Sequence, residues 1–293
     1  MIRRLCLLLL ALCTLLSLCG CKSNTHSPYD PAPLSLKILC IGNSFSADTV
    51  EHLADIASAL GVKDVKVANM YIGGCSIRKH YDNAVNKRPD YEYHVNEGDG
   101  WSVTHHRRII DIVKSEDWDW ISVQHGTADG SRYAEEESYE MLPALIEYLS
   151  AIAPEDTKIA FNMTWVGERN SHEELKSYGN NQTLYYNAIA KLTEETVEPV
   201  EGLDRLSPTG TAIQNARTAD LGLLTRDGYH LSKDLGCYIA GLTFFHALTN
   251  VDIWDIPWAP DGVTPHQKDV AVQSAVNAVA TPYAVTAYTK AEN

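Results

Sequence analysis

The fold is decided by a short stretch near the beginning of the chain, Leu36-Lys37-Ile38-Leu39-Cys40-Ile41-Gly42-Asn43-Ser44-Phe45-Ser46. Its apolar run, residues 36–41, predicts a buried strand, and Gly42 predicts a tight turn directly after it. Apolar residues then recur at helical spacing from Ser46 to Leu60, which predicts a helix. A strand, a tight turn and a helix in this order begin a unit in which the next strand lies parallel to the first.

The same alternation continues to the end of the chain. Further strands are predicted at 65–72, 118–123, 158–165 and, more weakly, 202–206, and further helices at 105–114, 138–152, 184–197, 232–248 and 267–279. Helices that connect parallel strands cover both faces of the sheet. The sequence therefore predicts an α/β fold, a three-layer α/β/α sandwich with a parallel, flavodoxin-like sheet of about five strands. We expect residues 35–293 to form a single domain, because no internal repeat or change of composition interrupts them.

The composition is that of a globular protein with an acidic surface. Of the 293 residues 45% are hydrophobic, and 24 Lys and Arg stand against 38 Asp and Glu, a formal net charge of −14. A chain of this length can bury a large core without disulfides. Binding to nucleic acid or to anionic lipid rests on a basic surface, so this charge argues against both. Membrane contact is expected through a lipid anchor only.

The first residues are typical of an export signal. Arg3 and Arg4 precede an uncharged apolar run that is too short to span a membrane, so residues 1–20 are predicted to be a signal peptide. The run ends at Cys21 in a sequence that resembles the bacterial lipobox, in which cleavage precedes a cysteine that is then acylated. A plain signal peptide is the alternative. Several acyl chains on Cys21 would hold the protein on a membrane surface.

The polar residues 21–34 are expected to be a tether. Lys22 follows the cysteine in place of the Asp that is associated with retention in the inner membrane. We therefore expect an exported lipoprotein of the outer membrane of a Gram-negative bacterium, on its periplasmic or surface face. Once the signal and its acylation site are set aside, Cys40, Cys75 and Cys237 remain, and their spacing does not form a disulfide framework. Cys40 and Cys237 are predicted to be buried thiols.

Candidate functional residues follow the carboxyl ends of the predicted strands, where such sheets bind their ligands. Ser44 lies at a strand-to-helix turn, where a serine hydroxyl can be exposed and its N–H can face a developing negative charge. Asp227 and His230, three residues apart near the C-terminus, can supply a base and the group that orients it. Each pattern also occurs as ordinary turn chemistry or as solvated surface.

Together, Gly42-Asn43-Ser44-Phe45-Ser46 and Asp227-Gly228-Tyr229-His230 resemble the first and last sequence blocks of the SGNH (GDSL-like) hydrolase superfamily. Segments 71–76, 208–217 and 225–232 look like a branch of it found in exported bacterial lipoproteins. The resemblance implies that Ser44 is the nucleophile, His230 the general base and Asp227 its orienting partner. It also implies that the backbone N–H groups of Ser44 and Gly74 stabilise the oxyanion.

The chain departs from the superfamily in its third block. Residues 119–129 align so that Ala128 occupies the position of the Asn that donates to the oxyanion. That donor is missing or is supplied by another residue. Gln124, at the end of the third predicted strand, is the favoured substitute, with an equally open alternative that it only fixes a loop. Asn162 is the second candidate.

The expected reaction is hydrolysis of an ester, with removal of an acyl group, most simply acetyl, from a carbohydrate. Trp165 and Tyr71 could stack on sugar rings, and Gln214 is a further predicted substrate contact. The partner is thus a small-molecule or glycan ester, and no cofactor is expected. No metal is expected either, since the adjacent His105 and His106 would point in different directions.

Two other functions remain open at this stage. One is a surface glycan-binding lipoprotein that keeps the fold without turnover, an alternative that Ala128 makes plausible. The other is a lipase or thioesterase, which is disfavoured because no long apolar stretch suits a lid. The sequence contains neither a phosphate-binding loop nor a dinucleotide fingerprint, which argues against nucleotide chemistry.

Overall fold

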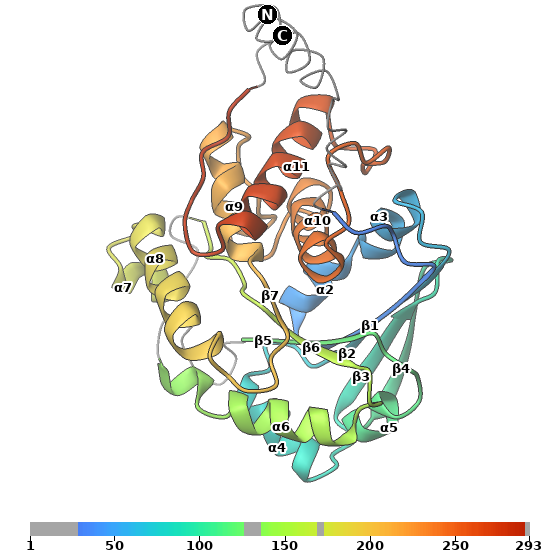
Figure 1. Ribbon diagram of the computed structural model, residues 1–293. Coiled ribbons are helices and arrows are strands. Elements are labelled where there is room, and N and C mark those ends of the chain that lie inside the picture. Colours follow the sequence, from blue (N-terminus) through green and yellow to red (C-terminus); the bar gives the residue numbers. More distant parts are fainter. Residues whose placement is uncertain (1–28, 126–135, 169–172, 291–293) are drawn as a thin grey trace, which may run out of the picture. The chain divides into compact units, whose positions relative to one another are not determined.

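A sheet of seven strands forms the centre of the fold in residues 29–125, 136–168 and 173–290, the part of the chain that the computed structural model describes (Figure 1). The contacts divide the chain into Met1–Asp30 and Pro31–Asn293, and the sheet lies in the second unit. The strands are β1 (Ser35–Gly42), β2 (Asp64–Tyr71), β3 (Tyr91–Asn96), β4 (Trp101–Arg107), β5 (Trp120–Gln124), β6 (Lys158–Asn162) and β7 (Arg205–Ser207), in the spatial order β4-β3-β2-β1-β5-β6-β7.

Helices cover both faces of this sheet (Figure 1). One face carries α2 (Ser44–Val50), α3 (Leu53–Ala59), α9 (Thr209–Ala216), α10 (Leu235–Thr249) and α11 (Pro265–Ala280). The other carries α4 (Ile77–Val85), α5 (Ile109–Val113) and α6 (Leu142–Ile152). The remaining helices are α7 (Glu173–Ser177), α8 (Gln182–Leu192), the 3₁₀ turns Glu136–Tyr139 and Arg217–Ala219, and a π-helical turn, Thr193–Val197.

The first strand shows why both faces are covered. Ile38 and Cys40 point to one side and belong to the core beneath α10, whereas Leu39 and Ile41 point to the other and belong to the core above α6. Successive side chains of a strand alternate between faces, so an unbroken apolar run requires a layer of helices on each side. The predicted three-layer α/β/α fold is confirmed. The parallel strands β2, β1, β5, β6 and β7 lie in the flavodoxin-like order.

The sheet is wider than predicted, because β3 and β4 form an antiparallel hairpin that extends it beyond β2. The turn is closed by Asn96, whose side-chain oxygen accepts hydrogen bonds from the N–H groups of Gly98 and Gly100, both of which have positive φ. The helix predicted over 105–114 is therefore wrong in its first part. Residues up to Arg107 pair with β3, and only Ile109–Val113 is helical.

The helix predicted from Ser46 to Leu60 is divided in two, α2 and α3. The break falls at Glu51 and His52, and both contact Lys233 near the start of α10. Cys40, Cys75 and Cys237 are buried free thiols, as predicted for Cys40 and Cys237.

Within the described ranges, no helix is long and apolar enough to cross a membrane. The predicted signal peptide (residues 1–20) and the acylation site Cys21 lie outside the described residues, so both stay predictions.

Candidate active site

Ser44 is the first residue of α2, directly beyond the carboxyl end of β1. Asn43 caps this helix, since its side-chain oxygen accepts a hydrogen bond from the N–H of Phe45 at 2.9 Å. The approach of the helix to the strand requires a glycine at position 42, because a Cβ there would lie 2.5 Å from Ser46 Oγ. Ser44 itself remains half-buried, so its hydroxyl is held at the strand end and is accessible.

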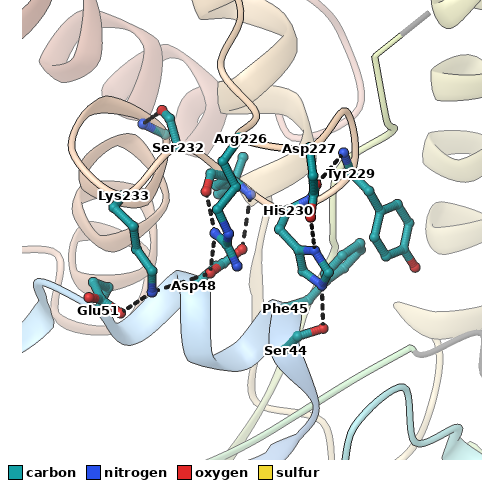
Figure 2. A network of polar contacts seen from close by, with 12 residues as sticks. Ser44, Phe45, Asp48, Glu51, Arg226, Asp227, Tyr229, His230, Ser232 and Lys233 are labelled. Atoms are coloured by element: carbon teal, nitrogen blue, oxygen red, sulfur yellow. Dashed lines mark hydrogen bonds and ion pairs between the residues drawn. The ribbon is translucent and has the colours of Figure 1, made fainter. Parts of the chain in front are cut away.

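His230 and Asp227 lie on a turn that faces the start of α2 (Figure 2). The Nε2 atom of His230 lies 2.9 Å from Ser44 Oγ, although the two residues are 186 positions apart in the sequence. The other ring nitrogen, Nδ1, lies 2.6 Å from Asp227 Oδ2. The structure thus brings the three predicted residues together in the order hydroxyl, imidazole and carboxylate.

The carboxylate of Asp227 is held by its own turn. Asp227 Oδ1 accepts hydrogen bonds from the N–H groups of Tyr229 at 2.9 Å and His230 at 2.7 Å. Burial opposes ionisation of Asp227, but these bonds and the bond from the His230 ring outweigh it and lower the pKa of the carboxyl to about 2. An ionised Asp227 requires a proton on Nδ1 of His230, which leaves Nε2 free to accept the proton of Ser44.

The turn after β2 is tied to the same site through Asn43. The amide nitrogen of Asn43 donates to the carbonyl oxygen of Cys75 at 3.1 Å. Gly74, one residue earlier, has φ of +60°, a conformation that favours glycine. Asn43 therefore connects the turn that carries Ser44 to the turn that carries Gly74, the second predicted oxyanion donor. This connection was not predicted from the sequence.

Gln124 is not directed at Ser44, which corrects its predicted role as an oxyanion donor. Its side-chain nitrogen donates to Asn43 Oδ1 at 2.7 Å and to the carbonyl oxygen of His125 at 3.4 Å. Both N–H bonds of the amide are therefore used, and the side chain is only 2% exposed. The bond to the backbone of His125 favours the alternative, in which Gln124 only fixes a loop, and the shorter bond shows that Gln124 also fixes the side chain of Asn43.

Asn162 also has its hydrogen bonds inside the core, which removes the second candidate donor. Its amide nitrogen donates to Thr49 Oγ1 at 3.0 Å, and its oxygen accepts from Thr209 Oγ1 at 2.7 Å. These bonds join β6 to α2 and α9. Ala128, the position that the resemblance assigns to the donor Asn, lies outside the described residues.

Trp165 is buried against Phe45, the residue after Ser44, which corrects its predicted role in stacking on sugar rings. The indole is 1% exposed, and its ring stacks on Phe45 with a centroid distance of 4.4 Å. Its N–H donates to the carbonyl oxygen of Tyr229 at 2.9 Å. No face of the ring is left for a ligand, and the contacts join α2 to the turn of His230.

Tyr71 and Gln214 have different surroundings. Tyr71, at the end of β2, is partly exposed and stacks on His94 with a centroid distance of 5.0 Å. Gln214 is 7% exposed, and its side-chain oxygen accepts a hydrogen bond from Arg217, which also donates to Glu168 at 3.2 Å. Gln214 is therefore engaged in a polar network inside the protein, whereas Tyr71 stays a predicted substrate contact.

Two residues near Ser44 were not predicted from the sequence. Asp48, in α2, and Arg226, before Asp227, form an ion pair at 2.9 Å. The spacing of Ser44 and Asp48, four residues, would have placed both on one side of a helix. Among the residues that the structure describes, no three His, Cys, Asp or Glu side chains gather as metal ligands would.

Several known structures are similar to this chain to different degrees. A DUF4886 family protein from Bacteroides uniformis has a TM-score of 0.80 and 36% identity, with 86% of this chain and 97% of that chain covered. An acetyl xylan esterase from Geobacillus stearothermophilus has a TM-score of 0.45 and 16% identity over 76% of this chain and 99% of that one. A lipolytic G-D-S-L family protein from Veillonella parvula has a TM-score of 0.44 and 12% identity over 84% of this chain and 100% of that one.

The search of curated proteins found no match. The model of the family described as a domain of unknown function, DUF4886, matches residues 37–278, which contain all of the strands from β2 to β7 and the three residues Ser44, Asp227 and His230. This match, together with the 36% identity to the Bacteroides uniformis protein, shows that the chain belongs to the DUF4886 family.

Proposed function

We propose that this protein is a serine ester hydrolase in which Ser44 is the nucleophile, His230 the general base and Asp227 the residue that orients His230. The observation that carries the proposal is the chain of contacts from Ser44 Oγ to His230 Nε2, 2.9 Å, and from His230 Nδ1 to Asp227, 2.6 Å. A serine hydroxyl becomes a useful nucleophile when a base within hydrogen-bond reach accepts its proton and a third group orients that base.

The proposed reaction has two halves. Ser44 Oγ attacks the carbonyl carbon of the ester while its proton moves to Nε2 of His230. The bond to the alcohol oxygen then breaks, the alcohol leaves with the proton from His230, and the acyl group stays on Ser44. In the second half, water gives a proton to His230 and attacks the acyl group, after which the carboxylic acid leaves and Ser44 regains its proton.

The negative oxygen of the intermediate requires fixed donors. The proposed donors are the backbone N–H groups of Ser44 and Gly74. Asn43 supports this arrangement, because it caps the helix of Ser44 and bonds to the carbonyl oxygen of Cys75 in the neighbouring turn. Gln124 acts one step further away, through its bond to Asn43.

For the substrate we propose an acyl ester of a carbohydrate, with acetyl as the simplest acyl group. Tyr71 supports this choice, because its partly exposed ring lies at the carboxyl end of β2, three residues before Gly74. The expected export and acylation at Cys21 support it too, since an outer-membrane lipoprotein meets glycans. The acetyl xylan esterase named above is an enzyme with such a substrate, but its likeness to this chain concerns the fold alone.

The test is a comparison of the purified wild-type protein with Ser44→Ala. We expect a burst of p-nitrophenol from p-nitrophenyl acetate, acetate release from acetylated xylo-oligosaccharides, and loss of both in Ser44→Ala except for about 10³ to 10⁴-fold residual catalysis over water. Ser46→Ala is the matched control, because the hydroxyl of Ser46 is buried and bonded to groups other than His230. Its Oγ lies 2.7 Å from the Asn43 carbonyl oxygen and 2.9 Å from Asn69 Oδ1. Ser46→Ala should keep the burst.

Two results would contradict the proposal. Wild-type turnover in Ser44→Ala would show that another group is the nucleophile. Saturable binding of the acetylated oligosaccharides without any acetate release would favour the non-catalytic glycan-binding lipoprotein instead.

A further inference from the structure

A buried carboxylate lies one helical turn beyond Ser44. Asp48 is 1% exposed, and each of its two oxygens accepts a hydrogen bond from the segment that carries His230. Oδ1 accepts from Arg226 Nη1 at 2.9 Å, and Oδ2 accepts from the N–H of Leu231, also at 2.9 Å. The helix that begins with Ser44 thus contacts that segment at a second point, about one turn further along its axis.

Two of the partners of Asp48, Arg226 and Leu231, flank the turn of Asp227 and His230, and a third, Lys233, lies beyond it with Nζ 3.8 Å from Asp48 Oδ1. The N–H of Arg226 donates to the carbonyl oxygen of His230 at 2.9 Å, and the Arg226 side chain also donates to the carbonyl oxygen of Leu231. A bridge between Thr225 and Leu231 closes the same turn. The turn is therefore a small closed loop, and both of its ends are attached to one carboxylate on α2 (Figure 2).

Such a carboxylate is costly to bury. Burial raises the pKa of Asp48 above its ordinary value, and Arg226, Lys233 and the N–H of Leu231 act in the opposite direction. In the ion pair with Arg226 only Asp48 is buried. Ion pairs that are taken out of water contribute little net stability compared with apolar residues of the same volume, but they can define one geometry over another. The location of this pair, between the element of Ser44 and the element of His230, indicates which geometry it defines.

We propose that Asp48 is a positioning residue that, through Arg226 and Leu231, holds the Asp227–His230 turn against the first turn of α2 and so sets the distance between Ser44 Oγ and His230 Nε2. This inference rests on the proposed function, because that distance matters for proton transfer from Ser44. A displacement of about 1 Å in such a contact can reduce a rate about 10²-fold.

The main test variant is Asp48→Asn. An asparagine can still accept from the N–H of Leu231, but its amide nitrogen cannot accept from Arg226, so the turn loses one of its two attachments. Arg226 can then turn to water, since 36% of its side chain is already exposed. With p-nitrophenyl acetate, we expect kcat to fall about 10 to 10²-fold at nearly unchanged KM in protein that is fully folded at the assay temperature.

Arg226→Gln removes the other partner of the same attachment and should give a similar loss. The double variant Asp48→Asn/Arg226→Gln should be no slower than the slower single variant, because the two residues act as one unit. Glu51→Gln is the control. Glu51, which directly follows α2, pairs with Lys233 of the same segment at 2.7 Å, but this ion pair is partly exposed and lies beyond the turn of His230. Its loss should leave kcat unchanged.

Several outcomes would overturn the inference. Unchanged kcat in folded Asp48→Asn, or a loss of activity that only follows the unfolded fraction, would show that Asp48 is merely structural. Additive losses in the double variant would show that Asp48 and Arg226 act separately. An equal loss in Glu51→Gln would show that any attachment of α2 to this segment has the same effect.

A failure of the proposed function gives a different result. In that case the wild-type protein neither hydrolyses p-nitrophenyl acetate nor reacts with a fluorophosphonate at Ser44. The crystal structure of Asp48→Asn then decides the inference. A longer Ser44–His230 separation than the 2.9 Å seen here would support the role of Asp48, and the same separation would overturn it.

Discussion

The side chain of Asn43 offers a sharp test of how the site is built. It is 3% exposed and takes part in three hydrogen bonds, with the N–H of Phe45, the amide of Gln124 and the carbonyl oxygen of Cys75. In Asn43→Ala the lost helix cap costs about 1 kcal/mol. The buried groups of Gln124 and Cys75 then lose a partner, which adds about 1 to 3 kcal/mol in total after relaxation.

The expected destabilisation of Asn43→Ala is therefore about 2 to 4 kcal/mol, which for a unit of this size corresponds to a decrease in Tm of about 5 to 15 °C. Urea unfolding and a thermal melt would measure it. Asn43→Ser is the matched variant, since serine caps a helix but is too short to reach Gln124 or Cys75. It should recover about 1 kcal/mol of the loss. A Tm of Asn43→Ala within about 2 °C of the wild type would refute this account of the three bonds.

The other predictions concern a catalytic contact, a buried base and the anchor. Asp227→Asn should lower kcat about 10³ to 10⁴-fold, because it favours the wrong tautomer of His230, and a kcat within tenfold of the wild type would contradict this role of Asp227. Because the pKa of Asp227 is about 2, Asp227 stays ionised between pH 8 and 4, and any loss of wild-type activity in that range must come from another group. Burial lowers the pKa of His80 to about 3, below the value of about 6.5 expected in the unfolded chain, so the unfolded state binds the proton first as pH falls. Protonation of His80 in the unfolded chain should thus decrease the free energy of unfolding by about 3 kcal/mol between pH 7 and 4, and His80→Gln should lack this part of the decrease. Urea titrations at several pH values measure the free energy of unfolding, and an equal decrease in both proteins would rule out this role of His80. Cys21→Ser should move the protein from the membrane fraction to the soluble fraction, and a native protein whose N-terminus begins after Cys21 would argue against the anchor.

The sequence by itself determined the class of fold and the three residues of the candidate site. Apolar runs and helical spacing are local patterns, and for Ile38 and Leu39 the pattern alone indicates two covered faces. Asp227 and His230 are three residues apart, so their contact is also local. Ser44 lies at the carboxyl end of a strand, where such sheets bind ligands, and the resemblance of its sequence block and of residues 227–230 to the SGNH superfamily placed the three residues together.

The partner of each buried polar side chain was decided only by the tertiary structure. Gln124 and Asn162 do lie at strand ends, as predicted, but their amides bond to Asn43 and Thr49. The hairpin of β3 and β4 depends on pairing with β2, which outweighed a weak helical pattern. A buried amide or carboxylate bonds to whichever group lies within about 3 Å after folding, and residues distant in sequence supply that group, so spacing along the chain carries no record of the choice.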